Sequence, residues 1–125
     1  MIHFLKKKYV EKDSIEKRDY QINLANQAID ENCIVVLPTG LGKTAIALNV
    51  IAEYLSKGTG GILFLAPTRV LVNQHYEFLE KNLTLDDISL ITGEDTIQKR
   101  TKLWSNSVIC ATPEIARNDF ARGII

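Results

Sequence analysis

The sequence predicts an α/β fold in which helices flank a parallel sheet. Apolar runs at residues 33–37, 62–66, 88–91 and 108–111 alternate with stretches of helical periodicity. Short runs of this kind are typical of parallel strands that are buried on both faces. Successive strands joined through helices form right-handed crossovers, so the ends of these strands should meet at one edge of the sheet.

Composition allows one domain of ordinary size. The chain has 125 residues, of which 46% are hydrophobic, and its 15 Lys and Arg residues balance 15 Asp and Glu residues. Net charge therefore gives no argument for a nucleic-acid partner. We expect an N-terminal arm over residues 1–14 and a domain over residues 15–125. Unpaired Cys33 and Cys110 suit a reducing compartment, and no run approaches the length of a membrane span, so we expect a cytoplasmic protein without a membrane partner.

A phosphate-binding loop follows the first apolar run. Its sequence is Pro-Thr-Gly-Leu-Gly-Lys-Thr, residues 38–44. Gly40 and Gly42 allow backbone N–H groups to point toward an anion at the start of the next helix. Lys43 would reach the β- and γ-phosphates, and the Thr44 hydroxyl would bind a magnesium ion. The loop therefore predicts an ATP and Mg²⁺ site, in which Lys43 and Thr44 carry the chemistry and Thr44 is the metal ligand.

Helices are expected on both sides of this loop. One runs from about residue 16 to 30, and its first turns carry Arg18-Asp-Tyr-Gln21. A side-chain amide such as that of Gln21 offers adenine both a donor and an acceptor. The second helix follows the loop and should end at Gly58. Its apolar spacing predicts a sheet-facing stripe of Ala47, Val50, Ile51, Tyr54 and Leu55.

Three later strands each run into a threonine-containing helix start or turn. Strand 62–66 leads to Pro-Thr-Arg at 67–69, strand 88–91 to Thr-Gly-Glu at 92–94, and strand 108–111 to Thr-Pro-Glu at 112–114. Thr112 suits a helix N-cap, with Pro113 at the first helical position. A row of hydroxyl and amide groups at one sheet edge can follow a phosphodiester backbone without reading bases. Taken singly, each of these residues could equally be a cap or a surface residue.

The loop lacks the first glycine of the general phosphate-loop pattern, because Leu37 occupies that position. In this it resembles motif I of superfamily 2 helicases. The other motifs, in order, are similar to the first half of such a motor: Arg18-x-Tyr-Gln21, residues 66–75, residues 92–94 and residues 111–114. Residues 91–94, Lys99-Arg100, Leu103-Trp104 and Asn118-Asp119 resemble the archaeal Hef and Fanconi anaemia M type of DNA helicase.

The resemblance implies a three-layer RecA-like domain of a DNA-dependent ATPase that acts on branched, forked or single-stranded DNA in repair. It implies ATP contacts at Arg18, Gln21, Pro38, Thr39, Gly40, Leu41, Gly42, Lys43 and Thr44. It implies contacts with the DNA backbone at Pro67, Thr68, Arg69, Thr92, Gly93, Thr112 and Pro113.

One motif of that family is missing from the sequence. No apolar strand ends in Asp-Glu-x-His, the motif whose acids hold magnesium and position water in the family. We therefore expect a domain truncated before this strand, which does not hydrolyse ATP alone and which needs the C-terminal helicase portion in cis or in trans. The alternatives are a non-catalytic fragment that binds nucleotide or nucleic acid, and part of an RNA-directed or restriction-type motor.

Overall fold

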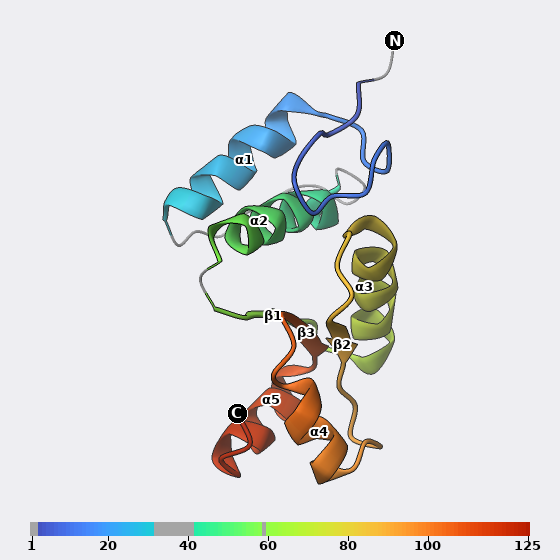
Figure 1. The fold of residues 1–125 in the computed structure, drawn as a ribbon, viewed down its shortest axis with the longest axis vertical. Coiled ribbons are helices and arrows are strands. Elements are labelled where there is room, and N and C mark those ends of the chain that lie inside the picture. The colour runs from blue at the N-terminus through green and yellow to red at the C-terminus, as the bar shows by residue number, and fades with distance from the viewer. Residues whose placement is uncertain (1–2, 32–41, 59) are drawn as a thin grey trace. The chain divides into compact units, whose positions relative to one another are not determined.

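A computed structural model describes residues 3–31, 42–58 and 60–125 of the chain (Figure 1). These residues form two compact units. The first comprises the described part of Met1–Thr59 together with Lys81–Thr84, and the second comprises Gly60–Glu80 and Leu85–Ile125. The predicted strand at 33–37 and the loop residues Pro38, Thr39, Gly40 and Leu41 lie outside the described residues.

The first unit contains two helices that pack against each other, α1 (Asp19–Asp30) and α2 (Lys43–Lys57). Helix α2 begins after Gly42 and ends at Gly58, and both glycines are left-handed, with φ of 74° and 66°. A left-handed glycine is a common end of a helix because it lacks the Cβ that would clash there. The predicted end of α2 at Gly58 is thus confirmed.

The predicted buried stripe of α2 is confirmed only in part. Ile51 is buried and Ala47, Val50 and Leu55 are half-buried, but Tyr54 is 37% exposed. The structure also buries Ile46, Leu48, Asn49 and Ala52, which were outside the predicted stripe. The burial of Asn49 is explained by the packing of α1 against α2. Asn49 lines a pocket together with Ile22 and Asn26 of α1. Apolar spacing within one helix does not reveal a neighbouring helix that also accepts a polar side chain.

The N-terminal segment of this unit is held by backbone contacts. The Leu5 N–H donates to the Ile15 carbonyl at 2.6 Å, and Val10 forms an antiparallel bridge with Leu83. Leu5 and Val10 are both only 8% exposed. This segment therefore contributes buried apolar surface to the unit.

The second unit contains, among its described residues, three parallel strands in the order β1-β3-β2. They are β1 (Ile62–Leu65), β2 (Ile88–Leu90) and β3 (Val108–Ala111), with β3 in the centre (Figure 1). Every residue of β3 is buried, and this burial raises the pKa of the Cys110 thiol to about 12. The predicted parallel sheet is confirmed.

Strand β1 differs from the expectation of burial on both faces. Its burial alternates, and Leu63 and Leu65 are each 45% exposed. Alternation is typical of a strand with only one covered face. The prediction that this strand is buried on both faces, which rested on its apolar composition, is therefore not met within the described unit.

Three helices complete the second unit: α3 (Arg69–Asn82), α4 (Ile97–Leu103) and α5 (Pro113–Ala121). Val72 and Leu79 of α3 are at most 2% exposed and form part of its buried face. Thr112 caps α5 as predicted, because its Oγ1 accepts a hydrogen bond from the Ile115 N–H at 3.5 Å. A small core of Ile91, Ile109 and Ala111 is covered by Leu103, Trp104 and Ile115.

Candidate nucleotide and nucleic-acid sites

The start of α2 has the features required of a phosphate site. Gly42 precedes Lys43 and Thr44, the first two residues of the helix, and provides no side chain to cap the first turn. A Cβ at this position would collide with the side-chain amide of Gln21, and φ is 74°. The positive φ strongly favours glycine here, and the N-terminal end of a helix favours an anion.

The predicted adenine reader lies beside the end of the phosphate loop. Gln21 is 4% exposed, and its Nε2 donates to the Gly42 carbonyl at 3.4 Å and to the Tyr20 hydroxyl at 3.5 Å. Arg18 is more exposed, and its Nη2 lies 3.1 Å from Glu16 Oε2. The structure therefore brings together Gln21 and Gly42, two of the predicted ATP contacts that are distant in the sequence.

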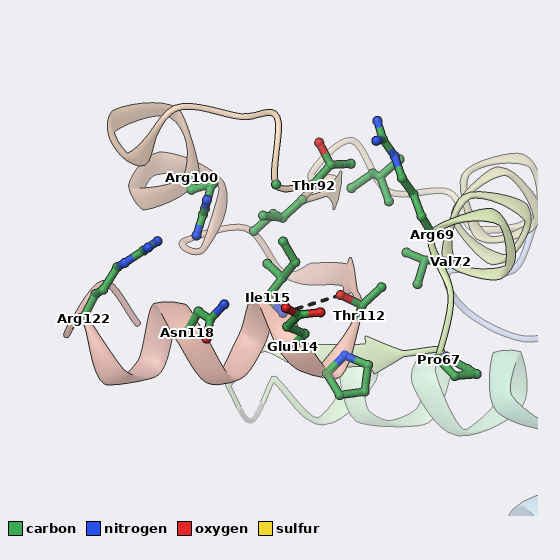
Figure 2. Close-up of a pocket in the computed structure, with 14 residues that line it drawn as sticks. Pro67, Arg69, Val72, Thr92, Arg100, Thr112, Glu114, Ile115, Asn118 and Arg122 are labelled. Carbon is green, nitrogen blue, oxygen red and sulfur yellow. Dashed lines mark hydrogen bonds between the residues drawn. The ribbon is translucent and has the colours of Figure 1, made fainter.

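A groove of about 770 Å³ in the second unit lies at the carboxyl ends of the strands (Figure 2). We call it the strand-end groove; it is lined by Pro67, Arg69, Val72, residues 90–93, Arg100, residues 112–115, Asn118 and Arg122. Six of the seven predicted backbone contacts are in this lining. The exception is Thr68. Its Oγ1 accepts a hydrogen bond from the Leu71 N–H at 3.2 Å and so caps α3, as the sequence also predicts for a threonine before a helix.

The turn after β2 is fixed by Asp95. Its Oδ2 accepts hydrogen bonds from the Thr92 N–H at 2.9 Å and from the Thr92 hydroxyl at 3.3 Å, and its Oδ1 lies 3.0 Å from Lys99 Nζ. Burial by itself would raise the pKa of Asp95, but the contacts with Thr92 and Lys99 outweigh it and lower the pKa. The charged carboxylate therefore holds Thr92 and Gly93 at the rim of the groove.

An exposed ion pair lies at one side of the groove. Arg69 Nη2 is 2.9 Å from Glu94 Oε2, and the two side chains are 62% and 76% exposed. Their hydrogen bond raises the pKa of Arg69 and lowers the pKa of Glu94. Because water surrounds both groups, the pair is weak and the guanidinium can exchange Glu94 for another anion.

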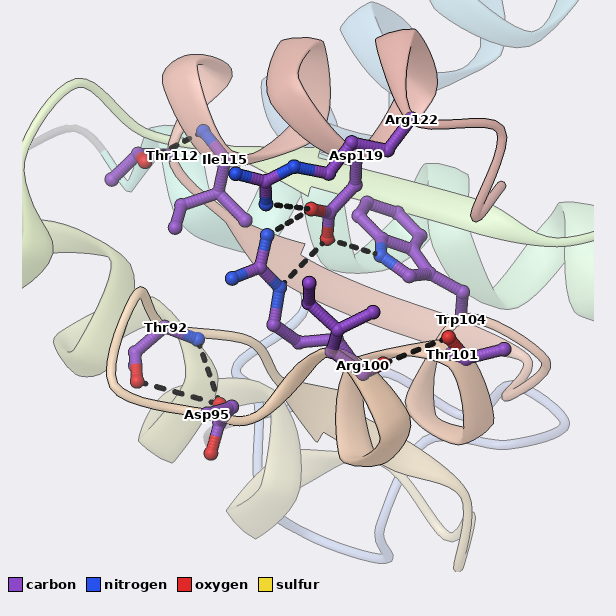
Figure 3. A network of polar contacts seen from close by, with 10 residues as sticks. Thr92, Asp95, Arg100, Thr101, Trp104, Thr112, Ile115, Asp119 and Arg122 are labelled. Atoms are coloured by element: carbon purple, nitrogen blue, oxygen red, sulfur yellow. Dashed lines mark hydrogen bonds and ion pairs between the residues drawn. The ribbon is translucent and has the colours of Figure 1, made fainter.

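A buried cluster joins α4 to α5, and its Arg100 also lines the groove (Figure 3). Both Arg100 Nε and Nη2 donate to the Asp119 carboxylate, and Trp104 Nε1 donates to Asp119 Oδ2 at 2.8 Å. The Arg100 and Asp119 side chains are 7% and 0% exposed. The contact with Arg100 lowers the pKa of Asp119 against the opposing effect of burial. The sequence predicts Trp104 on one helix face with Ile97, and it gives Arg100 and Asp119 only a place in the family likeness.

The sequence matches the DEAD/DEAH box helicase family over residues 18–123. The chain belongs to this family. This helicase chain is 40% identical over 125 residues to a Methanocaldococcus jannaschii protein named as an ATP-dependent RNA helicase, covering 98% of this chain and 16% of that protein. It is 36% identical over 122 residues to the ATP-dependent DNA helicase MPH1 of Candida albicans, covering 95% of this chain and 10% of MPH1.

Among solved structures, the helicase chain is similar to the Hef helicase domain of Pyrococcus furiosus. The TM-score is 0.85 at 40% identity, and the match covers 94% of this chain and 26% of the other. The helicase chain therefore spans only a small part of the relatives that it matches. The expected fold class, a fragment of a RecA-like helicase domain of the Hef and Fanconi anaemia M type, is confirmed by these matches.

Two acidic residues near the sheet of the helicase chain lie in local structural positions. Asp87 Oδ2 accepts hydrogen bonds from the Ser107 N–H at 2.8 Å and hydroxyl at 2.6 Å, and Glu114 lies in the first turn of α5. In the part of the chain that the structure describes, no group of three or more His, Cys, Asp or Glu residues could hold a metal ion. None of the helices described is long and apolar enough to cross a membrane.

Proposed function

We propose that this chain is the ATP-binding part of a superfamily 2 DNA helicase or translocase that acts on branched or forked DNA in repair. The observation that carries the proposal is the strand-end groove, where turns from three strand ends place hydroxyl groups, backbone amides and Arg69 along one surface. Such groups contact phosphates and sugars and carry no base information. They suit a motor that must move along any sequence.

ATP and Mg²⁺ are the proposed ligands of the first unit. The residues that would hold them are Gly42, Lys43 and Thr44 at the start of α2, together with Gln21 and Arg18 from the beginning of α1. Bound magnesium would neutralise charge on the β- and γ-phosphates. Lys43 would add a positive charge to the same phosphates, and Gln21 would orient the base through its amide.

DNA is the proposed polymer, although the family also includes motors named for RNA. The relative from Candida albicans is named a DNA helicase, as are the Fanconi anaemia M relative of Drosophila and several other MPH1 proteins. The Methanocaldococcus jannaschii relative is named for RNA. Because the groove offers mainly backbone contacts, a direct comparison of the two polymers is needed to decide between them.

The nucleotide proposal is tested by thermal unfolding of the 125-residue chain with and without Mg-ATP. A ligand that binds only the folded state raises the melting temperature, and at a concentration 100-fold above Kd the added stability is about 2.7 kcal/mol. Lys43→Ala should remove this rise. Lys57→Ala removes the same charge from the other end of α2 and should preserve it. A rise that persists in Lys43→Ala would sink the assignment of the loop.

The polymer proposal is tested by binding and ATP turnover with forked DNA, single-stranded DNA and RNA of equal length. We expect forked or single-stranded DNA to bind more tightly than RNA. Turnover should be absent from this chain alone and should appear when the C-terminal helicase portion is supplied. Preference for RNA would favour the RNA-directed alternative, and turnover by the chain alone would contradict the expected truncation.

A further inference from the structure

The far end of the strand-end groove holds a positive charge that none of the predicted contacts uses. Arg122 lines the groove at the C-terminal end of α5, with its side chain 52% exposed. Asn118 lines it one helical turn earlier, and Figure 2 shows both along the same helix as Thr112 and Glu114. Residues four apart lie on one helix face, so this face of α5 borders the groove along its whole length.

The charge of Arg122 is not neutralised by its ion pair. Arg122 Nη1 lies 3.7 Å from Asp119 Oδ1, but the same carboxylate already receives two donors from Arg100 and one from Trp104. Two arginines therefore share one carboxylate. Because the contact of Arg100 with Asp119 is buried and bidentate, the charge of Arg100 balances the negative charge of Asp119. One positive charge remains, and it lies on the exposed partner.

Thr112 and Arg122 flank α5 at its two ends. Arg122 is ten residues after Thr112, which is about 15 Å along a helix at 1.5 Å per residue. One strand of a duplex rises 3.4 Å per nucleotide along its axis, so this length corresponds to about four nucleotides of a strand that runs along α5. Among the described residues that line the groove, Glu114 is the single acidic one. It lies close to Thr112 and not to Arg122.

Building on the proposed function, we infer that Asn118 and Arg122 form a further phosphate-contact position of the strand-end groove, with Asp119 as a positioning residue that aims Arg122. Arg122 would supply the charge and Asn118 a neutral hydrogen bond. Arg100 and Trp104 would hold Asp119 in place through their hydrogen bonds to its carboxylate. The nucleic-acid strand would then be held at both ends of α5 instead of only at the threonine turns.

The test is binding of the 125-residue chain to a fluorescent oligothymidylate over a series of salt concentrations. Arg122→Gln should weaken binding about two- to fivefold, as loss of an exposed ion pair does. It should also reduce the slope of log affinity against log salt by about 0.7, the value for one phosphate contact on a single strand. Asn118→Ala should weaken binding without changing the slope, and Arg122→Lys should preserve the slope.

Arg117→Gln is the matched control. Arg117 is exposed on the same helix but is not part of the groove lining, so this change alters net charge equally without removing a contact. Equal slopes for Arg122→Gln and Arg117→Gln would overturn the inference. Arg69→Gln separates this outcome from failure of the proposed function. If Arg69→Gln lowers the slope and Arg122→Gln does not, only the further contact is wrong. If neither variant changes the slope, or if the chain does not bind the oligonucleotide, the proposed nucleic-acid site in the groove is itself wrong.

Discussion

Two arginine–carboxylate pairs of the second unit have the same chemistry and different surroundings. Arg69 and Glu94 meet at the rim of the strand-end groove, where both side chains are more than half exposed. Arg100 and Asp119 meet in a buried contact, where neither side chain is more than 7% exposed. The first pair joins the start of α3 to the turn after β2, and the second joins α4 to α5.

The difference shows that burial decides whether an arginine–carboxylate pair stabilises the fold or leaves the arginine able to bind another anion. In water an ion pair is worth little, because solvent competes for both partners. In the interior, removal of one partner leaves an uncompensated charge, which is costly. We therefore interpret Arg100 and Asp119 as holding two helices together, and Arg69 as a group that can leave Glu94 for a phosphate.

The largest expected effect is from Asp119→Ala. This change leaves Arg100 buried without its carboxylate and removes the acceptor for Trp104, so unfolding should become easier by about 3–5 kcal/mol. Chemical denaturation measures this change. Asp86→Ala, at an exposed position near β2, is the control and should change stability little. An Asp119→Ala chain that is as stable as the control would show that the buried pair does not hold the helices.

The second largest effect is expected from acid, which should reduce the contribution of the Arg100–Asp119 pair to the free energy of unfolding. The pKa of Asp119 in the folded chain lies below its ordinary value of 3.8, so its contribution is fully present above that value and is lost as pH falls through the folded pKa. The midpoint of urea unfolding should therefore fall as pH drops below about 4. In Asp119→Asn the decline should be shallower, although Asp87 and Asp95 also have lowered pKa values and add to it. Identical declines in the two proteins would contradict the lowered pKa of Asp119.

An intermediate effect is expected from Thr112→Ala. Loss of an N-cap typically costs about 1 kcal/mol, because the N–H that it accepted is left without its partner. Thr101→Ala is the matched control, since that hydroxyl donates to the Ile97 carbonyl within α4 and caps nothing. Denaturant midpoints of the two variants should differ, and equal midpoints would show that the Thr112 cap is not needed.

The smallest effect on stability is expected from Glu94→Gln, which should leave the melting temperature unchanged because the pair is exposed. If Arg69 contacts phosphates, however, the same variant should bind an oligonucleotide about twofold more tightly, because a competing anion has been removed. Anisotropy titration at low salt measures this change. Weaker binding by Glu94→Gln would show that Glu94 supports the contact instead of competing with it.

The sequence predicted the turns that line the strand-end groove, because each of them is a local feature. A threonine or proline after an apolar run specifies a turn or a helix start within a few residues, and parallel strands then place these turns at one edge. Thr112 shows this directly, since its cap on α5 was predicted from neighbouring residues alone. Thr68 follows the same local rule, since its hydroxyl caps the first turn of α3, but it does not line the groove.

The buried cluster could not be predicted in the same way. Arg100 is buried in α4, whereas the apolar residue Ile97 of the same helix is 53% exposed. The stripe of α2 is confirmed only in part for a similar reason, because Asn49 is buried beside α1 while Tyr54 is exposed. A helical pattern assumes that apolar residues face the interior, and it does not show where a distant carboxylate or amide makes burial of a polar group favourable.

The sequence by itself determined the alternation of strands and helices, the glycine at the start of α2, and the helicase family, because these depend on short-range backbone chemistry and on motifs read in order. Tertiary structure alone decided that Gln21 would lie against Gly42, and that Arg100 would find Asp119 nineteen residues away. It also placed Arg122, 3.7 Å from Asp119, in the lining of the groove. These pairings depend on which side chains the folded backbone brings within hydrogen-bonding distance, and no local pattern encodes that distance.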